Sequence, residues 1–153
     1  MTHRIRPATL ADIPAMVRLE QISFPGDRLS VRSLRRLVRE GRAICLVAEV
    51  EEHVVGDAVV LLRRGSRSAR LYSVAVDPAR RKAGIGTALM AEAERLAVSS
   101  GRDVMRLEVR EDNVAAHRRY LATGYVTVGS KPGFYDDGAA AISMKKRLAG
   151  LPV

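Results

Sequence analysis

The sequence predicts a mixed α/β fold of the α+β class, in which helices flank a central twisted mixed sheet. Strand and helix candidates follow one another without the strict alternation of a doubly wound sheet. Three apolar strand candidates succeed one another between residues 43 and 76, and a strand, a cationic turn with glycines and a helix follow over residues 71–97. We expect residues 1–153 to form one domain, because a chain of this length can bury a single sizeable core.

The N-terminal segment predicts a strand and a helix. Residues 3–7 read as a short strand. Thr9 follows as a helix N-cap, with Asp12 three residues later as an acidic variant of the capping box. We expect the helix to end near Ile22. The residues that recur at helical spacing in this segment are Ile13, Met16, Val17 and Glu20.

A second helix and two strands come next. Ser30 is a good N-cap for this helix, and Gly41 suits its C-terminal end. Residues 43–50 and 54–62 are apolar strand candidates. The short polar turn 51–53 separates them, so we expect a β-hairpin.

The middle of the chain predicts a third strand and a third helix. Residues 63–68 form a turn before a strand over 69–76, which we expect to run antiparallel to its neighbour. A set of apolar residues then recurs at helical spacing: Ile85, Leu89, Ala93, Leu96 and Ala97. Gly101 suits the C-terminal end of this helix.

The C-terminal third predicts three strands and one helix. Residues 104–109 read as a short buried strand, and residues 113–123 as a helix. A final pair of strands, 125–128 and 139–146, surrounds the loop 130–138. Proline, glycine and aspartate supply the turn chemistry of this loop.

The chain is strongly basic, with 26 Lys and Arg against 17 Asp and Glu and a net charge of +9. Residues 63–82 carry seven cations against one carboxylate, and residues 28–42 carry six arginines against one. Such fields attract coenzyme A phosphates, acidic proteins or RNA, and a basic surface with no partner is the alternative. Without tryptophan, and with two Phe and four Tyr, the chain has no stacking ladder for single-stranded nucleic acid, so no nucleic acid is required.

The other features of the composition constrain the cellular compartment of the protein and the cofactors it can bind. A single cysteine excludes an internal disulfide, and neither a membrane-spanning apolar run nor a signal-peptide core is present. We therefore expect a cytoplasmic protein without a membrane partner. Three dispersed histidines and one cysteine show no metal-ligand spacing, so we expect no metal. The oligomeric state stays open, with a homodimer as one possibility.

A glycine motif, Arg81-x-x-Gly84-x-Gly86, lies at the junction of the strand and the helix in residues 71–97. The first turn of a helix presents unpaired N–H groups to an anion, and glycine lets the backbone come close. The motif resembles the Q/R-x-x-G-x-G/A signature with which the GNAT superfamily of N-acetyltransferases holds the pyrophosphate of acetyl-coenzyme A. An ordinary strand–turn–helix with a basic rim is the other interpretation.

This resemblance implies a GNAT-like fold with acetyl-coenzyme A as co-substrate, bound in a cleft between two splayed strands, 69–76 and 104–109. It also implies that backbone donors of the first strand meet the acetyl carbonyl and the pantetheine arm. The residues expected to bind the co-substrate are Val74, Ala75, Val76, Arg81, Lys82, Ala83, Gly84, Ile85, Gly86 and Thr87.

A second motif covers residues 107–125. It resembles the L-E-V-R-x-x-N-x-x-A-x-x-x-Y-x-x-x-G-[FY] segment of the bacterial N-terminal acetyltransferases that modify ribosomal-protein alanine. The resemblance implies that Glu108 is the general base, directly or through a water, and that Tyr120 is the general acid for the coenzyme A thiolate. It also implies that Asn113 meets the pantetheine arm, while its place before the helix suits an N-cap.

Both catalytic assignments have structural alternatives. The carboxylate of Glu108 could instead pair with Arg106 or Arg110 on its own strand. The ring of Tyr120 could instead serve as a half-buried aromatic group against the sheet.

Two further residues are candidates for binding the acceptor. Tyr135 follows Phe134 in the last loop, and the pair resembles the aromatic residues with which N-terminal acetyltransferases cover the peptide; packing of the loop is the alternative. Asp27 could meet a cationic amine or be a turn carboxylate. Its segment, 24–28, reads Phe-Pro-Gly-Asp-Arg where the ribosomal-protein enzymes have Phe-Pro-Trp, and the acidic residue of the family's last strand is missing here.

Together these features predict an N-acetyltransferase that moves acetyl from acetyl-coenzyme A to an amine. A protein N-terminal α-amine is the expected acceptor, with a ribosomal protein as a possible partner. Direct attack in a ternary complex is expected, since no Cys or Ser lies in a nucleophile motif. The alternatives are a small amine such as a polyamine, amino acid or drug, and a non-catalytic coenzyme A-binding or RNA-associated module.

Overall fold

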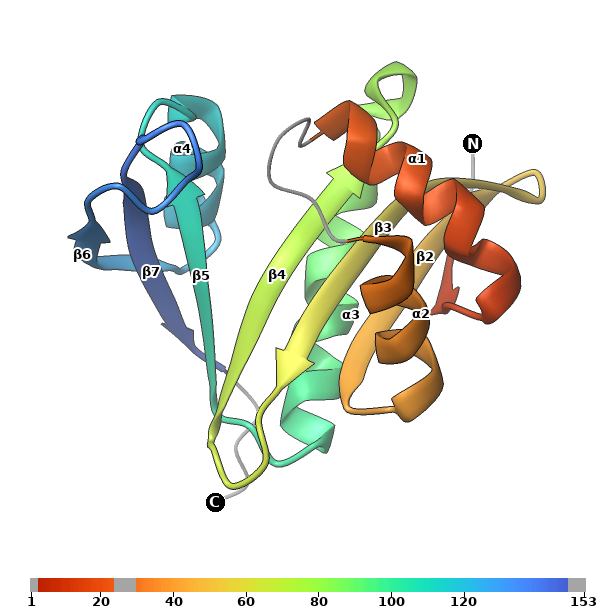
Figure 1. Ribbon diagram of the computed structural model, residues 1–153, viewed down its shortest axis with the longest axis horizontal. Coiled ribbons are helices and arrows are strands. Elements are labelled where there is room, and N and C mark those ends of the chain that lie inside the picture. The colour runs from red at the N-terminus through yellow and green to blue at the C-terminus, as the bar shows by residue number, and fades with distance from the viewer. Residues whose placement is uncertain (1–2, 24–29, 149–153) are drawn as a thin grey trace.

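Seven strands form one mixed sheet in the computed structural model, which describes residues 3–23 and 30–148 (Figure 1). The strands are β1 (Arg4–Pro7), β2 (Ala43–Val50), β3 (His53–Leu62), β4 (Ser68–Val76), β5 (Val104–Arg110), β6 (Val126–Lys131) and β7 (Ala141–Arg147). Their order across the sheet is β1-β2-β3-β4-β5-β7-β6. The predicted mixed fold is confirmed.

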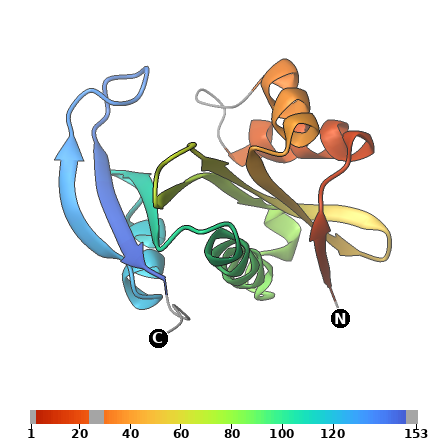
Figure 2. The same cartoon turned by 90° about the horizontal axis from the view of Figure 1, so that it is seen from below.

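Helices cover both faces of this sheet (Figure 2). The helices are α1 (Ile13–Ser23), α2 (Val31–Glu40), α3 (Ile85–Ser99) and α4 (Val114–Ala122). One buried apolar cluster joins α1 and α2 to the sheet, and a larger one joins α3 and α4 to the opposite face. No helix in the described parts of the chain is both long and apolar enough to span a membrane.

The predicted helix ends are confirmed at several points. The Ser30 hydroxyl accepts the N–H of Ser33 at 3.0 Å, and Gly41 ends α2 in the left-handed conformation with φ of 69°. The Asp12 carboxylate accepts the N–H of Thr9 at 2.7 Å. That first turn is a 3-10 helix, Leu10–Asp12, and α1 follows it directly.

The first four strands form an antiparallel meander. The β2–β3 hairpin is tighter than predicted, because His53 already pairs with Val50 and only Glu51 and Glu52 remain in the loop. Their φ angles of 50° and 68° are the positive values that a two-residue type I′ hairpin requires. Asparagine and glycine adopt such angles more easily than glutamate does.

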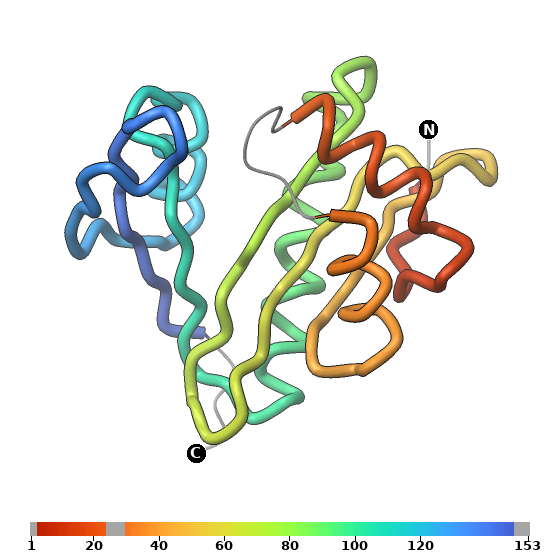
Figure 3. The backbone as a smooth tube through the Cα atoms, in the orientation of Figure 1, coloured from red at the N-terminus to blue at the C-terminus, as the bar shows by residue number. Residues whose placement is uncertain are grey.

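The strands β4 and β5 pair in parallel over three residue pairs only, which run from Ser68–Val104 to Arg70–Arg106. Beyond Arg70 the two strands diverge, while the other edge of β5 pairs with β7 along its whole length (Figures 1 and 3). The predicted splayed strand pair is therefore present.

The C-terminal hairpin differs from its predicted bounds. Strand β6 extends to Lys131, because Ser130 and Lys131 pair with Ile142 and Ala141 of β7. The connecting loop therefore covers residues 132–140, later than the predicted start at residue 130. Tyr125 lies just before β6 and is buried in the core, with 1% of its surface exposed.

Candidate active site

The turn between β4 and α3 has the conformation expected of an anion-binding loop. The carboxylate of Asp77 accepts the N–H of Ala79 at 2.9 Å and caps a short 3-10 turn, Pro78–Arg80. Lys82 and Gly84 then adopt positive φ angles of 70° and 80°. With these angles the chain leaves the 3-10 turn and enters α3 at Ile85.

The N-terminus of α3 is open to an anion. Gly84 supplies no capping side chain, and the Ala88 N–H donates to the Gly84 carbonyl at 3.0 Å. The N–H groups of residues 85–87 come before this first helical hydrogen bond. They therefore have no acceptor within the helix and point outward from its N-terminus. Arg81 and Lys82 are exposed beside them. Backbone donors, a helix dipole and two cations suit the phosphates of coenzyme A.

The diverging end of β4 leaves backbone donors available for a carbonyl oxygen. The β3–β4 register shifts between Val59 and Val60, so β4 contributes one residue more than β3 there. The pairing of β4 with β5 ends at Arg70. Residues 74–76 lie beyond this point. The backbone groups of Val74 and Val76 turn toward this open edge and suit the acetyl carbonyl and the pantetheine arm, whereas those of Ala75 turn toward β3 and its N–H lies near Asp57.

Both carboxylate oxygens of Glu108 are held by cations, one from the neighbouring strand β4 and one from β6, which lies beyond β7. One lies 2.7 Å from Nη2 and 3.0 Å from Nε of Arg70 on β4, and the other lies 3.2 Å from Nζ of Lys131 on β6. The predicted partners were wrong, because Arg106 donates to Ser68 Oγ at 3.3 Å and Arg110 pairs with two aspartates. Cross-strand neighbours reach Glu108, although they are remote in the chain.

Tyr120 on α4 is partly buried in the core beside α3. Its ring meets the edge of the Tyr125 ring, with 5.5 Å between centroids, so the aromatic packing role is present. Burial raises the pKa of the Tyr120 hydroxyl above its usual range, and the group keeps its proton at neutral pH. Asn113 caps the same helix by accepting the N–H of Ala116 at 3.1 Å.

The loop that carries Tyr135 is tied to β5 next to Glu108. The guanidinium of Arg110 lies 5.2 Å from the Tyr135 ring centroid and forms an ion pair with Asp137. Phe134 contacts Tyr135 edge to face, with 5.0 Å between ring centroids. The loop packing role is therefore present, and the rings lie on the Glu108 side of the molecule.

Asp27, the other predicted acceptor-binding residue, lies outside the described residues. In the described part of the chain, no three His, Cys, Asp or Glu side chains gather in a way that could hold a metal ion.

Sequence analysis missed a buried polar cluster beneath α1. The carboxyl groups of Glu20 and Asp57 and the hydroxyl of Ser73 lie in the apolar interior, and no hydrogen-bond partner reaches their oxygens. Two signals could have revealed it. Glu20 occurs at helical spacing with Ile13 and Met16, and Asp57 interrupts an apolar strand.

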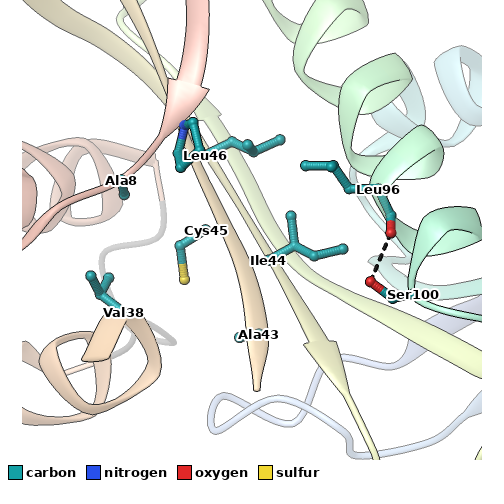
Figure 4. A pocket seen from close by; sticks show the side chains of 9 residues that line it. Ala8, Val38, Ala43, Ile44, Cys45, Leu46, Leu96 and Ser100 are labelled. Atoms are coloured by element: carbon teal, nitrogen blue, oxygen red, sulfur yellow. Dashed lines mark hydrogen bonds between the residues drawn. The ribbon is translucent and has the colours of Figure 1, made fainter. Parts of the chain in front are cut away.

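A hollow of about 250 Å³ lies elsewhere, at the edge of β2 (Figure 4). None of its lining residues belongs to the predicted site: they are Pro7, Ala8, Val38, Ala43, Ile44, Cys45, Leu46, Leu96 and Ser100. Burial raises the pKa of the Cys45 thiol to about 11, which makes it a poor nucleophile at neutral pH.

Comparison with known proteins gives a consistent result. The model of the acetyltransferase (GNAT) family matches residues 13–125. An N-alpha-acetyltransferase of Sulfurisphaera tokodaii is 28% identical over 95% of this chain and 93% of its own. An uncharacterized protein of Mycobacterium leprae is 30% identical over 92% of this chain, which spans only 39% of that relative's length.

Two solved structures share nearly the whole fold. Ard1 from Thermoplasma volcanium is 31% identical with a TM-score of 0.89, and the match covers 98% of this chain and 100% of that one. A ribosomal-protein-alanine N-acetyltransferase from Brucella melitensis is 26% identical with a TM-score of 0.82, over 95% of this chain and 99% of that one.

Proposed function

Because this chain belongs to the acetyltransferase (GNAT) family, we propose that it transfers the acetyl group of acetyl-coenzyme A to the α-amine of a protein N-terminus. As a member of the family it uses acetyl-coenzyme A as the acyl donor. We also propose that the chain forms a single domain. One observation carries the acceptor class. Proteins named for N-alpha and ribosomal-protein-alanine acetylation match this chain over 95% or more of its length.

The donor is assigned to the turn and the first turn of α3. Arg81, Lys82 and the N–H groups of residues 84–87 would hold the phosphates, with Ala83 in the same turn. The backbone of Val74 and Val76, on either side of Ala75, would orient the pantetheine arm and the carbonyl. Acetyl-coenzyme A supplies an activated thioester, so the protein has to position it and stabilise developing negative charge on the carbonyl oxygen.

We assign the proton transfers to two side chains on either side of the diverging strands. Glu108 would take a proton from the incoming ammonium, directly or through a water, while Arg70 and Lys131 hold its carboxylate in place. One of these contacts must loosen for an oxygen to accept the proton. Tyr120 would give its proton to the leaving thiolate, and its raised pKa supports this role by keeping the hydroxyl protonated. Asn113 would contact the pantetheine arm.

We assign the acceptor to the side of the site that carries the loop with Tyr135. Asp27 remains a proposed contact for the amine of the acceptor. A ribosomal protein is the proposed physiological acceptor, and a small amine is the alternative that the test separates from it. A non-catalytic coenzyme A-binding module would give no turnover on either.

Thiol release from acetyl-coenzyme A tests this proposal, with peptides bearing Ala, Ser or Met N-termini and a panel of small amines. We expect turnover on a peptide, and a loss of about 10²-fold in kcat in Glu108→Gln. Glu92→Gln is the matched control, because Glu92 lies on the exposed face of α3 in an ion pair with Arg95. Turnover on small amines alone would overturn the acceptor class, and full activity of Glu108→Gln would overturn the assigned base.

A further inference from the structure

Three polar side chains from three elements meet under α1. Glu20 comes from α1, Asp57 from β3 and Ser73 from β4, and their exposed fractions are 0%, 0% and 5%. Asp57 is paired with Ala75 and lies on the same face of the sheet as its partner. Ser73 is two residues before Ala75 in β4, so it shares that face. The Ser73 hydroxyl lies close enough to lower the pKa of Glu20, although no hydrogen bond of ordinary geometry joins them.

In the described structure, only the Ala75 N–H near Asp57 and the Ser73 hydroxyl near Glu20 lower the pKa values of these carboxyls; neither makes a hydrogen bond of ordinary geometry, and neither is a cation. Neither Glu20 nor Asp57 takes part in any of the ion pairs between described residues, and all four carboxyl oxygens lack a hydrogen-bond partner there. Among the described residues, the Cys45 thiol on β2 is the further titratable group that interacts with Asp57. An unpaired buried charge costs several kcal/mol, so such a pair calls for a cation or a shared proton.

The pair is poised to gain or lose a proton near neutral pH. Burial raises the pKa of Glu20 to about 7, and Ser73 opposes this shift only in part. Burial, with the nearby Glu20, also raises the pKa of Asp57 well above its usual range. Around pH 7, therefore, Glu20 is partly protonated, and the raised pKa of Asp57 favours its protonated form as well.

The cluster lies directly behind the assigned reaction centre. Ser73 immediately precedes residues 74–76, the backbone assigned to the acetyl carbonyl. Glu20 occupies the last turn of α1, which leads into the segment 24–29 that contains Asp27. The carboxyls thus lie on the face of the sheet that α1 covers, opposite α3, whose first turn is assigned to the donor.

We propose that Glu20 and Asp57 form a buried anionic subsite that attracts the acceptor's primary ammonium to β4, with Ser73, whose hydroxyl oxygen is itself buried, between the pair and that ammonium. This inference rests on the proposed transferase function. Glu20 and Asp57 act through Ser73 and are positioning residues. Glu108 remains the group that takes the proton from the ammonium before attack.

The subsite distinguishes substrate from product by charge. An ammonium at Ser73 stabilises the ionised form of the pair, because charges interact strongly in the low-dielectric interior. One carboxyl proton then leaves to solvent as one ammonium enters, and the net charge of the site is unchanged. The product amide carries no charge, so the pair regains its proton when the amide has formed. The attraction that held the substrate is then lost, which favours release of the product.

Calorimetric titration measures this proton release without turnover. The protein loaded with coenzyme A is titrated at pH 6.5 with an Ala-terminated peptide, in two buffers of different ionisation enthalpy. We expect roughly 0.8 proton released per peptide, the protonated share of a group of pKa about 7. The acetylated peptide should release none. Glu20→Gln should release less than about 0.2 proton, since the titrating group is gone.

Steady-state kinetics provide the second readout. Between pH 6 and pH 8 the KM for the peptide should fall about tenfold in the wild type, and less than about twofold in Glu20→Gln. Asp57→Asn should keep most of this fall, because burial rather than Asp57 raises the pKa of Glu20. The kcat of these variants should stay near the wild-type value. Ser73→Ala should raise KM throughout this range, and Ser73→Thr should restore it by returning the hydroxyl. Glu94→Gln is the control, because Glu94 pairs with Lys146 and lies outside the cluster.

The two proposals fail in different ways. If peptides are acetylated but Glu20→Gln releases as many protons as the wild type, the ammonium subsite is wrong and the transferase function stands. If no peptide is acetylated, the acceptor class is wrong, and the same titration with putrescine decides whether the pair serves a small ammonium. Absence of proton release with both ligands overturns the subsite.

Discussion

Carboxylates occur in two opposite settings around the reaction centre. Glu108 is enclosed by Arg70 and Lys131, and 10% of its side chain is exposed. Glu20 is more deeply buried, and no cation in the described structure pairs with it. The first arrangement fixes a charge in place, while the second leaves a proton free to exchange with the surroundings. We assign them accordingly, one to proton abstraction and the other to recognition of charge.

Replacing Tyr120 with phenylalanine tests the proposed acid. Tyr120→Phe removes the hydroxyl and keeps the edge-to-face contact with Tyr125. We expect kcat to fall about 10²-fold, because the thiolate loses its proton donor, while the KM for acetyl-coenzyme A stays within about twofold. Thiol release measures both constants. The matched control is Tyr125→Phe, which loses a 2.8 Å hydrogen bond to Glu94 but should keep its kcat. Equal kcat values in the two variants would contradict the assignment.

Residue roles were only partly accessible from the sequence. The segment around Glu108 and Tyr120 resembles a known motif, so both could be named. The partners of Glu108 could not, because Arg70 and Lys131 are 38 and 23 residues away and reach it only through strand pairing. The pair of Glu20 and Asp57 was hidden for the same reason, although each residue interrupts an apolar pattern.

At the scale of elements, the β2–β3 hairpin holds two glutamates at positive φ. The double change Glu51→Asn with Glu52→Gly should raise the free energy of unfolding by about 1 kcal/mol, since these residues suit a type I′ turn. Urea unfolding measures the change. Glu51→Ala is the control, because it removes a charge but leaves a Cβ at positive φ. If the control stabilises equally, charge rather than backbone conformation is responsible.

Local signals predicted the elements well where one residue determines a helix end or a turn. Ser30 and Gly41 bound α2 as expected. The bounds of the last hairpin were wrong, because pairing with β7 extends β6 through Ser130 and Lys131. The β4–β5 divergence was predicted only by resemblance to a family. No local pattern encodes where two parallel strands separate.

At the scale of the whole molecule, the buried carboxyls should make stability depend on pH. The pKa of Glu20 is about 7 in the folded state, against 4.5 for an exposed glutamate. The folded chain therefore binds more protons than the unfolded chain between these values, and stability falls as pH rises through this window. The contribution is complete below about pH 4.5 and lost above about pH 7. The loss is on the order of 3 kcal/mol for Glu20 alone.

Chemical denaturation at intervals from pH 5 to pH 8 measures this slope. Glu20→Gln should flatten it, and adding Asp57→Asn should flatten it further at higher pH. Carboxylates with lowered pKa, such as Asp12 and Asp137, lose their contribution only at lower pH, so they do not mask the effect. Stability that rises over this range would contradict the proposed ionisation of the pair.

The short junction of β4 and β5 has a consequence for how this molecule can evolve. Strand pairing joins the two parts of the sheet at three residue pairs, and the further contacts between them run through the core shared with α3 and through Glu94, which binds Tyr125 and Lys146. Mutations that reshape the loop around Tyr135 can thus accumulate without rebuilding the turn that precedes α3. Under the proposed function, the fold separates the loop assigned to the acceptor from the turn assigned to the donor, so one inherited scaffold could serve several acceptors.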